Sequence, residues 1–210
     1  MMLLFGINSY AQNYSKEQIK AVEQEAASIK TDTTTIAFYN LKTENDFDLD
    51  ATKTFQTLDS ILVFIAIKKQ DKANIFEDII APYLEVKSNE LDLKTLNFSE
   101  DEKLIYDSFL QVLEWRKAIE IVSLYEGFIL KSYKEPEKME SVLTVLSFIK
   151  YLHFYIKGKE KLQSESFVYK CLAENFEENN EVDWRVFALD PARLIFWTIT
   201  ACAWDVKSEK

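Results

Sequence analysis

The stretch that decides the fold runs from Ser99 to Ile156 and reads SEDEKLIYDSFLQVLEWRKAIEIVSLYEGFILKSYKEPEKMESVLTVLSFIKYLHFYI. It contains two long apolar patterns with helical spacing, and one proline, Pro136, lies between them. The first pattern opens with Ser99 and Glu102, whose spacing is that of a capping box. It predicts either one long helix to about residue 131 or two helices with a bend near Trp115.

The second pattern predicts a central helix bounded by Pro136 and Gly158. Proline suits the first turn of a helix, and glycine suits the position just after its end. Apolar residues cover much of the circumference, so we expect this helix to be buried on several sides, with Leu146 and Ile149 in the core. It is too short and too polar to span a membrane, which needs about 20 mostly apolar residues.

Composition indicates a helical domain around this pair. The chain has 210 residues, enough for one domain with a substantial core. It has only 3 glycines and 3 prolines, too few for the turns of a sheet protein. We therefore expect an all-α fold over residues 12–210: a single-domain irregular bundle of about seven or eight helices around the long central helix pair.

The first eleven residues resemble the end of a secretory signal from an exported Gram-negative protein. Ser9 and Ala11 are small residues at the −3 and −1 positions of a cleavage site, after a short apolar run. A start site placed too far downstream would explain why that run is shorter than the usual length of about 7–15 residues and lacks a basic start. We interpret residues 1–11 as a signal-peptide remnant of a periplasmic or secreted protein; the alternative is a frayed N-terminal tail.

The other expected elements surround the central pair. Capping and apolar spacing predict a first helix that begins after Ser15, a second over about residues 51–69, and a third from Ile75 that Pro82 kinks or ends. A long polar connection is expected at residues 85–98, a helix from about residue 163, and an irregular or extended segment at residues 184–189. Asp190 and Pro191 have the N-cap and first-turn chemistry of a last helix.

Local signatures of catalysis are scarce in this sequence. His153 is the only histidine, so a site built from several histidines is not available, and a lone histidine among aromatic residues is expected to be packed. The sequence has neither a nucleophile-elbow motif nor a Gly-rich phosphate loop. We expect no catalytic residue, metal site or cofactor. The alternative is an all-α carboxylate enzyme or a small-ligand carrier, because paired carboxylates leave no local signature.

Two acidic clusters form the candidate partner-binding surface. A net charge of −10 argues against nucleic acid or an anionic membrane surface as a partner and suits a basic protein. The clusters lie in predicted loops, and Trp184 beside the second could be an apolar anchor. Their residues are Asp46, Asp48 and Asp50 in the first, and Glu177, Glu178, Glu181 and Asp183 in the second. The alternative is that both clusters are solvated loops and that Trp184 belongs to the core.

The first cluster also begins like a calcium loop. The match fails at Ala51 and Thr57, which stand where such a loop needs glycine and glutamate. No metal site is therefore expected there.

Cys171 and Cys202 are the only cysteines. Export to an oxidising compartment favours a disulfide between them, and the alternative is two separate buried thiols. These features together favour an exported, non-catalytic helical interaction protein. One form would be an acidic immunity-type or inhibitor-type protein that neutralises a secreted toxin in the periplasm, and another a helical envelope scaffold or adaptor.

Overall fold

The computed structural model describes residues 16–29, 46–68, 76–90, 95–133, 135–158, 170–171, 174–178 and 183–205. All regular structure in these ranges is helical, which confirms the all-α prediction. The α-helices are α1 (Lys16–Ser28), α2 (Asp46–Lys68), α3 (Ala81–Glu90), α4 (Glu100–Val112), α5 (Ala118–Ser132), α6 (Glu140–Gly158), α9 (Trp184–Leu189) and α10 (Pro191–Asp205). The 3-10 segments are Trp115–Lys117 and Pro136–Met139, and the π-helical turns are Phe76–Ile80 and Glu174–Glu178.

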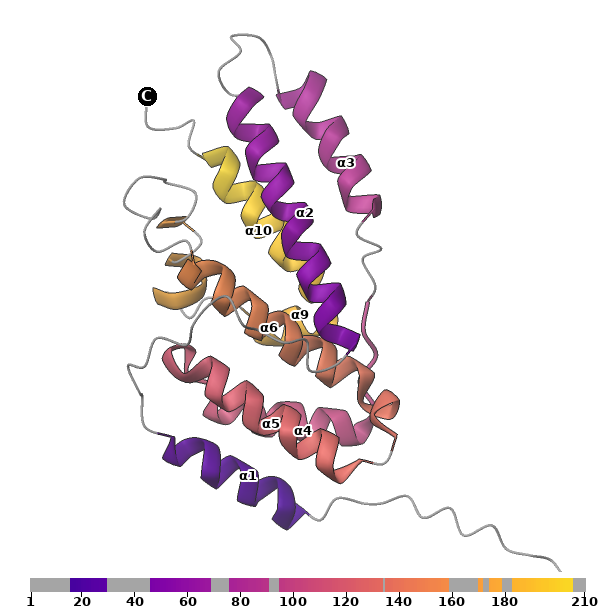
Figure 1. Ribbon diagram of the computed structural model, residues 1–210, viewed down its shortest axis with the longest axis vertical. Coiled ribbons are helices and arrows are strands. Elements are labelled where there is room, and N and C mark those ends of the chain that lie inside the picture. The colour runs from indigo at the N-terminus through magenta and orange to yellow at the C-terminus, as the bar shows by residue number, and fades with distance from the viewer. Residues whose placement is uncertain are drawn as a thin grey trace, which may run out of the picture.

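Helix α6 lies at the centre of the bundle (Figure 1). Helices α4 and α5 pack on one side of it with α1 outside them, whereas α2 and α10 pack on the other side with α3 next to α2. Nearly every residue of α6 from Ser141 to Ile156 is buried. Leu146 and Ile149 are fully buried, as predicted, because apolar side chains cover this helix all round.

The first half of the predicted central pair consists of two helices, α4 and α5. The capping box is present, since the Ser99 side chain accepts from the Glu102 N–H and the Glu102 side chain accepts from the Ser99 N–H. The backbone is extended at Leu113 and Glu114, and the buried Trp115 side chain follows. This break redirects the apolar stripe, so both α4 and α5 contact α6.

Two predictions around α2 and α3 are wrong. Helix α2 begins at Asp46, so the first acidic cluster lies in its opening turns and not in a loop. Carboxylates there suit the positive end of the helix dipole. Helix α3 continues to Glu90, into the stretch predicted as a connection. Pro82 does not end this helical stretch, although the π-helical turn Phe76–Ile80 changes into α3 one residue before the proline. Pro82 therefore lies in the first turn of α3, a position that suits proline.

The segment from Trp184 to Leu189 is helix α9 and not an irregular or extended segment. Asp183 starts it by accepting a hydrogen bond from the Arg185 N–H at 3.0 Å. Asp190 accepts from the Arg193 N–H at 3.0 Å at the start of α10, as predicted. Residues 1–11, which are predicted to be a signal-peptide remnant, and most of the helix predicted from about residue 163 lie outside the described residues.

Candidate functional site

The predicted partner-binding residues divide between described and undescribed parts of the chain. The backbone of Asp46, Asp48 and Asp50 lies in α2, and that of Glu177 and Glu178 in the π-helical turn, but their side chains lie outside the described part. Glu181 is also outside it. Of the second cluster, Asp183 is exposed at the start of α9, and Trp184 is partly buried beside it. Helix α9 is therefore the part of the candidate surface whose side-chain contacts the structure describes.

The inner side of α9 is tied to the core at both ends. The Trp184 ring stacks on Trp115, with 6.0 Å between the ring centroids, and meets Phe187 edge-on at 5.1 Å. The Tyr106 hydroxyl donates a hydrogen bond to the Trp184 carbonyl. At the other end, the Leu96 N–H donates to the Leu189 carbonyl at 2.7 Å. Trp184 thus packs with the core and contributes little free apolar surface.

The outer side of α9 carries two exposed aliphatic residues. Val186 and Leu189 are each 50% exposed. They are three positions apart, so they are neighbours on one face of the helix. Together with Asp183, the N-cap of α9, they define what we call the α9 patch.

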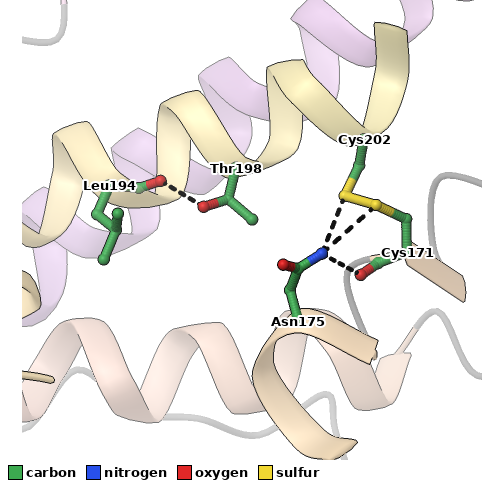
Figure 2. The surroundings of a disulfide bond; sticks show 5 residues. All are labelled: Cys171, Asn175, Leu194, Thr198 and Cys202. Atoms are coloured by element: carbon green, nitrogen blue, oxygen red, sulfur yellow. Dashed lines mark hydrogen bonds between the residues drawn. A yellow bond between two sulfur atoms is a disulfide. The ribbon is translucent and has the colours of Figure 1, made fainter. Parts of the chain in front are cut away.

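The α9 patch lies within the loop closed by the Cys171–Cys202 disulfide. The two sulfurs are 2.08 Å apart, and 31 positions separate the cysteines. Figure 2 shows the Asn175 amide between the two linked segments: its Nδ2 donates to the Cys171 carbonyl at 2.8 Å and lies 3.5 Å and 3.7 Å from the two sulfurs. The bond therefore connects the chain before α9 to the far end of α10.

A buried ion pair joins α5 and α6 near the centre of the molecule. The Lys150 ammonium donates to both carboxylate oxygens of Glu126 at 3.0 Å. Glu126 is 0% exposed and Lys150 is 3% exposed. Sequence reasoning did not single out either residue, although a charge at a buried position of an apolar helix was a usable signal. Because both groups are sealed from solvent, the pair orients helices and does not offer a site to a ligand.

Two further polar contacts connect α4 to its neighbours. Oε1 of Glu102 accepts from the Ser141 N–H at 2.8 Å, so this one carboxylate also caps α6. The Ser108 hydroxyl donates to Glu23 of α1 at 3.1 Å and lies 2.8 Å from the Tyr125 hydroxyl. Burial raises the pKa of Tyr125 to about 12, because the phenolate would lose hydration.

His153 belongs to an aromatic cluster. It is buried, and its ring centroid lies 5.2 Å from that of Trp115, which also stacks on Phe176. The histidine is thus packed, as expected for a lone histidine among aromatic residues. Among the described residues, no group of three or more His, Cys, Asp or Glu side chains could hold a metal ion. None of the helices in that part of the chain is long and apolar enough to cross a membrane.

Comparisons of the chain with protein-family models, with curated proteins and with solved structures give no match. The function must therefore be argued from the chain's own surface.

Proposed function

We propose that the protein is an exported, non-catalytic binding protein that captures a basic protein partner through the α9 patch and the acidic residues before it. The observation that carries this proposal is the exposed pair Val186 and Leu189 on the helix that the exposed Asp183 caps. Aliphatic side chains supply contact area, and neighbouring carboxylates supply charge complementarity to a basic surface.

The fixed inner side of α9 supports this proposal. Trp184 and Phe187 hold the helix against the core, and backbone carbonyls at both of its ends accept hydrogen bonds from other segments. A surface that is already ordered loses little conformational entropy when a partner binds. The α9 patch is thus better suited to binding than an equally exposed pair on a loosely held segment.

The net charge supports a basic partner, and the disulfide supports a location in an oxidising compartment. A net charge of −10 would speed the encounter with a basic partner, and that gain would decrease with added salt. Disulfides persist mainly in oxidising compartments, and Cys171–Cys202 suits the periplasm or the cell exterior. An immunity-type or inhibitor-type protein directed at a basic secreted toxin fits these features, and an envelope scaffold would use the same surface.

The test is a pull-down from the native envelope at low and at high salt with three forms of the protein. One variant removes the apolar pair by changing Val186 and Leu189 to serine. The control variant Val86→Ser makes the same kind of change at a residue of α3 that is 55% exposed. We expect the wild type and the control to recover a basic partner at low salt, and the α9 variant to lose it.

A second variant examines the charges. It converts Glu177, Glu178, Glu181 and Asp183 to their amides, and we expect it to recover less partner and to show a weaker salt dependence. If all forms recover the same proteins in the same amounts, the α9 surface is not the binding surface and the proposal fails.

A further inference from the structure

We propose that the Cys171–Cys202 disulfide is a redox switch for helix α9. The closed bond holds the π-helical turn Glu174–Glu178 against the aromatic residues that support α9, and reduction of the bond releases this support. The consequence for partner capture rests on the proposed function, because it concerns the α9 patch. The loosening of α9 itself involves no partner, so it can be measured separately.

The π-helical turn Glu174–Glu178 depends on contacts outside itself. It has 5 residues, and isolated helices shorter than about 12–15 residues are marginal in water. Figure 2 shows that Asn175 of this turn donates from Nδ2 to the Cys171 carbonyl at 2.8 Å and also reaches the two sulfurs, at 3.5 Å and 3.7 Å. Because the Cys202 sulfur belongs to α10, the closed bond keeps the turn beside α10. Once the bond opens, the two sulfurs separate and this one amide no longer reaches both.

Phe176 connects the turn to the inner side of α9. Its side chain is 2% exposed, and its ring stacks on Trp115 with 6.5 Å between the ring centroids. Trp115 also stacks on Trp184, the first residue of α9, at 6.0 Å. Trp115 therefore joins the turn to α9. When Phe176 moves away, Trp115 loses one of its packing partners, and the support that holds Trp184 in place is weaker.

The switch works by thiol–disulfide exchange with a dithiol. Cys171 is partly exposed whereas Cys202 is 2% exposed, so Cys171 is the accessible end of the bond. A thiolate of the dithiol attacks the Cys171 sulfur, the S–S bond breaks, and its electron pair goes to the Cys202 sulfur, which takes up a proton. The second thiolate then attacks the mixed disulfide, and Cys171 leaves as a thiolate and is protonated. The dithiol supplies both electrons and both protons and becomes a disulfide.

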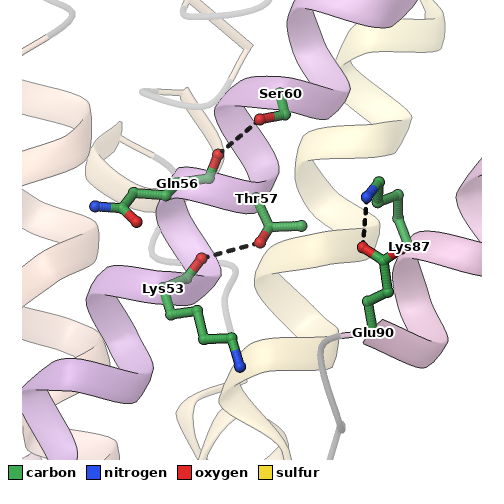
Figure 3. Close-up of polar contacts among 6 residues, drawn as sticks. All are labelled: Lys53, Gln56, Thr57, Ser60, Lys87 and Glu90. Atoms are coloured by element: carbon green, nitrogen blue, oxygen red, sulfur yellow. Dashed lines mark hydrogen bonds and ion pairs between the residues drawn. The ribbon is translucent and has the colours of Figure 1, made fainter.

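Contacts elsewhere in the bundle do not involve the cysteines. Figure 3 shows the hydroxyls of Thr57 and Ser60 donating to carbonyls of α2 itself, at 3.0 Å and 3.2 Å. It also shows Lys87 paired with Glu90 within α3. The buried ion pair between α5 and α6 likewise includes no residue near the disulfide. Reduction should therefore loosen α9 locally and leave these helices folded.

Amide hydrogen exchange of the wild type, measured by nuclear magnetic resonance before and after reduction with dithiothreitol, tests the switch. Two amides report on α9. The Phe187 N–H donates to the Asp183 carbonyl at 2.9 Å within the helix, and the Leu96 N–H donates to the Leu189 carbonyl at 2.7 Å from another segment. We expect both amides to exchange about 10–100-fold faster after reduction, because α9 opens more often when the loop is no longer closed.

Two controls separate a local effect from a general one. The Lys103 N–H donates to the Ser99 carbonyl at 2.9 Å in the first turn of α4, and its exchange should change by less than about threefold. The variant that carries Cys171→Ser and Cys202→Ser leaves the bond open without a reductant. Its α9 amides should exchange as in the reduced wild type, and dithiothreitol should have no further effect on them.

Either of two results would overturn the switch. The first is an exchange of the α9 amides that is the same in the oxidised and the reduced wild type. The second is an equal acceleration at Lys103, because the bond would then stabilise the whole fold and not α9 in particular. The pull-down from the native envelope is then repeated with the serine double variant, which should recover less partner than the wild type; equal recovery would refute the regulation of capture. The exchange experiment needs no partner, so the switch and the proposed function can fail separately.

Discussion

Replacing Glu102 by glutamine should destabilise the fold by about 3 kcal/mol, since its carboxylate accepts four hydrogen bonds with charged strength. Oε2 accepts from the N–H of Ser99 at 2.8 Å and from its hydroxyl at 2.9 Å. Oε1 accepts from the N–H groups of Ser141 at 2.8 Å and Val142 at 3.3 Å. One carboxylate therefore satisfies the first turns of both α4 and α6.

The expected loss in the free energy of unfolding depends on which of these hydrogen bonds glutamine can still accept. The single oxygen of glutamine can keep the bonds to Ser141 and Val142, and its NH₂ group then faces Ser99. The Ser99 hydroxyl can reverse and accept from this NH₂ group, but the Ser99 N–H cannot, so one charge-assisted bond of about 1.5–3 kcal/mol is lost. The two bonds that remain on the oxygen no longer involve a charge, which roughly halves their strength. Adding the lost bond to the weakened pair gives about 3 kcal/mol.

Urea unfolding followed by circular dichroism measures this loss as a lower midpoint at unchanged slope. The matched control is Glu100→Gln, an exposed position in the same first turn. It should cost only about 0.3–1 kcal/mol, the contribution of a charge near a helix start. If the two variants lose the same stability, the Glu102 carboxylate does not hold both helix starts and the reasoning fails.

Four further expectations concern the core, the ion pair, the disulfide and alkaline pH. Leu146→Ala should lower the free energy of unfolding by about 2–5 kcal/mol, because the side chain is fully buried, and a loss below about 1 kcal/mol in urea unfolding would contradict its place in the core. Lys150→Met should cost about 3–5 kcal/mol in the same assay, since the buried Glu126 carboxylate loses both hydrogen bonds from the Lys150 ammonium. Thiol labelling of the denatured, unreduced protein should find neither Cys171 nor Cys202 free, and replacing both by serine should cost about 3 kcal/mol through loop entropy. Burial raises the pKa of Tyr125 in the folded protein to about 12 from an ordinary value of 10.0. The contribution of the neutral Tyr125 to stability is therefore complete below pH 10 and is lost as the pH rises to about 12. Ultraviolet titration would measure this pKa, and unfolding at each pH would measure the loss of stability.

Local chemistry made several elements predictable. The capping box at Ser99, the Asp190 cap and the central helix after Pro136 each depend on residues a few positions apart, and the structure has all three. The prediction of an irregular or extended segment at residues 184–189 was wrong because six residues are too few to show a helical period. The predicted binding residue Asp183 is also the N-cap of this helix, a role that the sequence analysis did not assign to it. Elements with strong short-range signals were therefore predicted correctly, whereas the conformation of segments with weak signals depends on tertiary packing.

Contacts between distant residues could not be predicted in this way. Glu102 was recognised as half of a capping box, but its bonds to α6 cross 39 and 40 positions. The Glu126–Lys150 pair crosses 24 positions, and no local rule matches a buried acid with its cation. The α9 patch was located only through its acids, because the choice between Trp184 and Val186 as the exposed residue depends on which side of a short helix faces the core.

The polar residues of α6 explain how a largely apolar bundle adopts one arrangement. Apolar packing is not directional, so helices covered with Leu, Ile, Val and Phe could slide or rotate against each other at little cost. Three residues of α6 prevent this, each by binding a different neighbour. The backbone N–H of Ser141 donates to Glu102 of α4, the Lys150 ammonium donates to Glu126 of α5, and the Tyr155 hydroxyl donates to Asp59 of α2 at 2.9 Å. A shift of any one helix would break a hydrogen bond between buried or partly buried polar groups, which is costly in the interior. The frame that carries the α9 patch is therefore fixed from its centre, and the exposed residues of this patch can change by mutation without disturbing the frame.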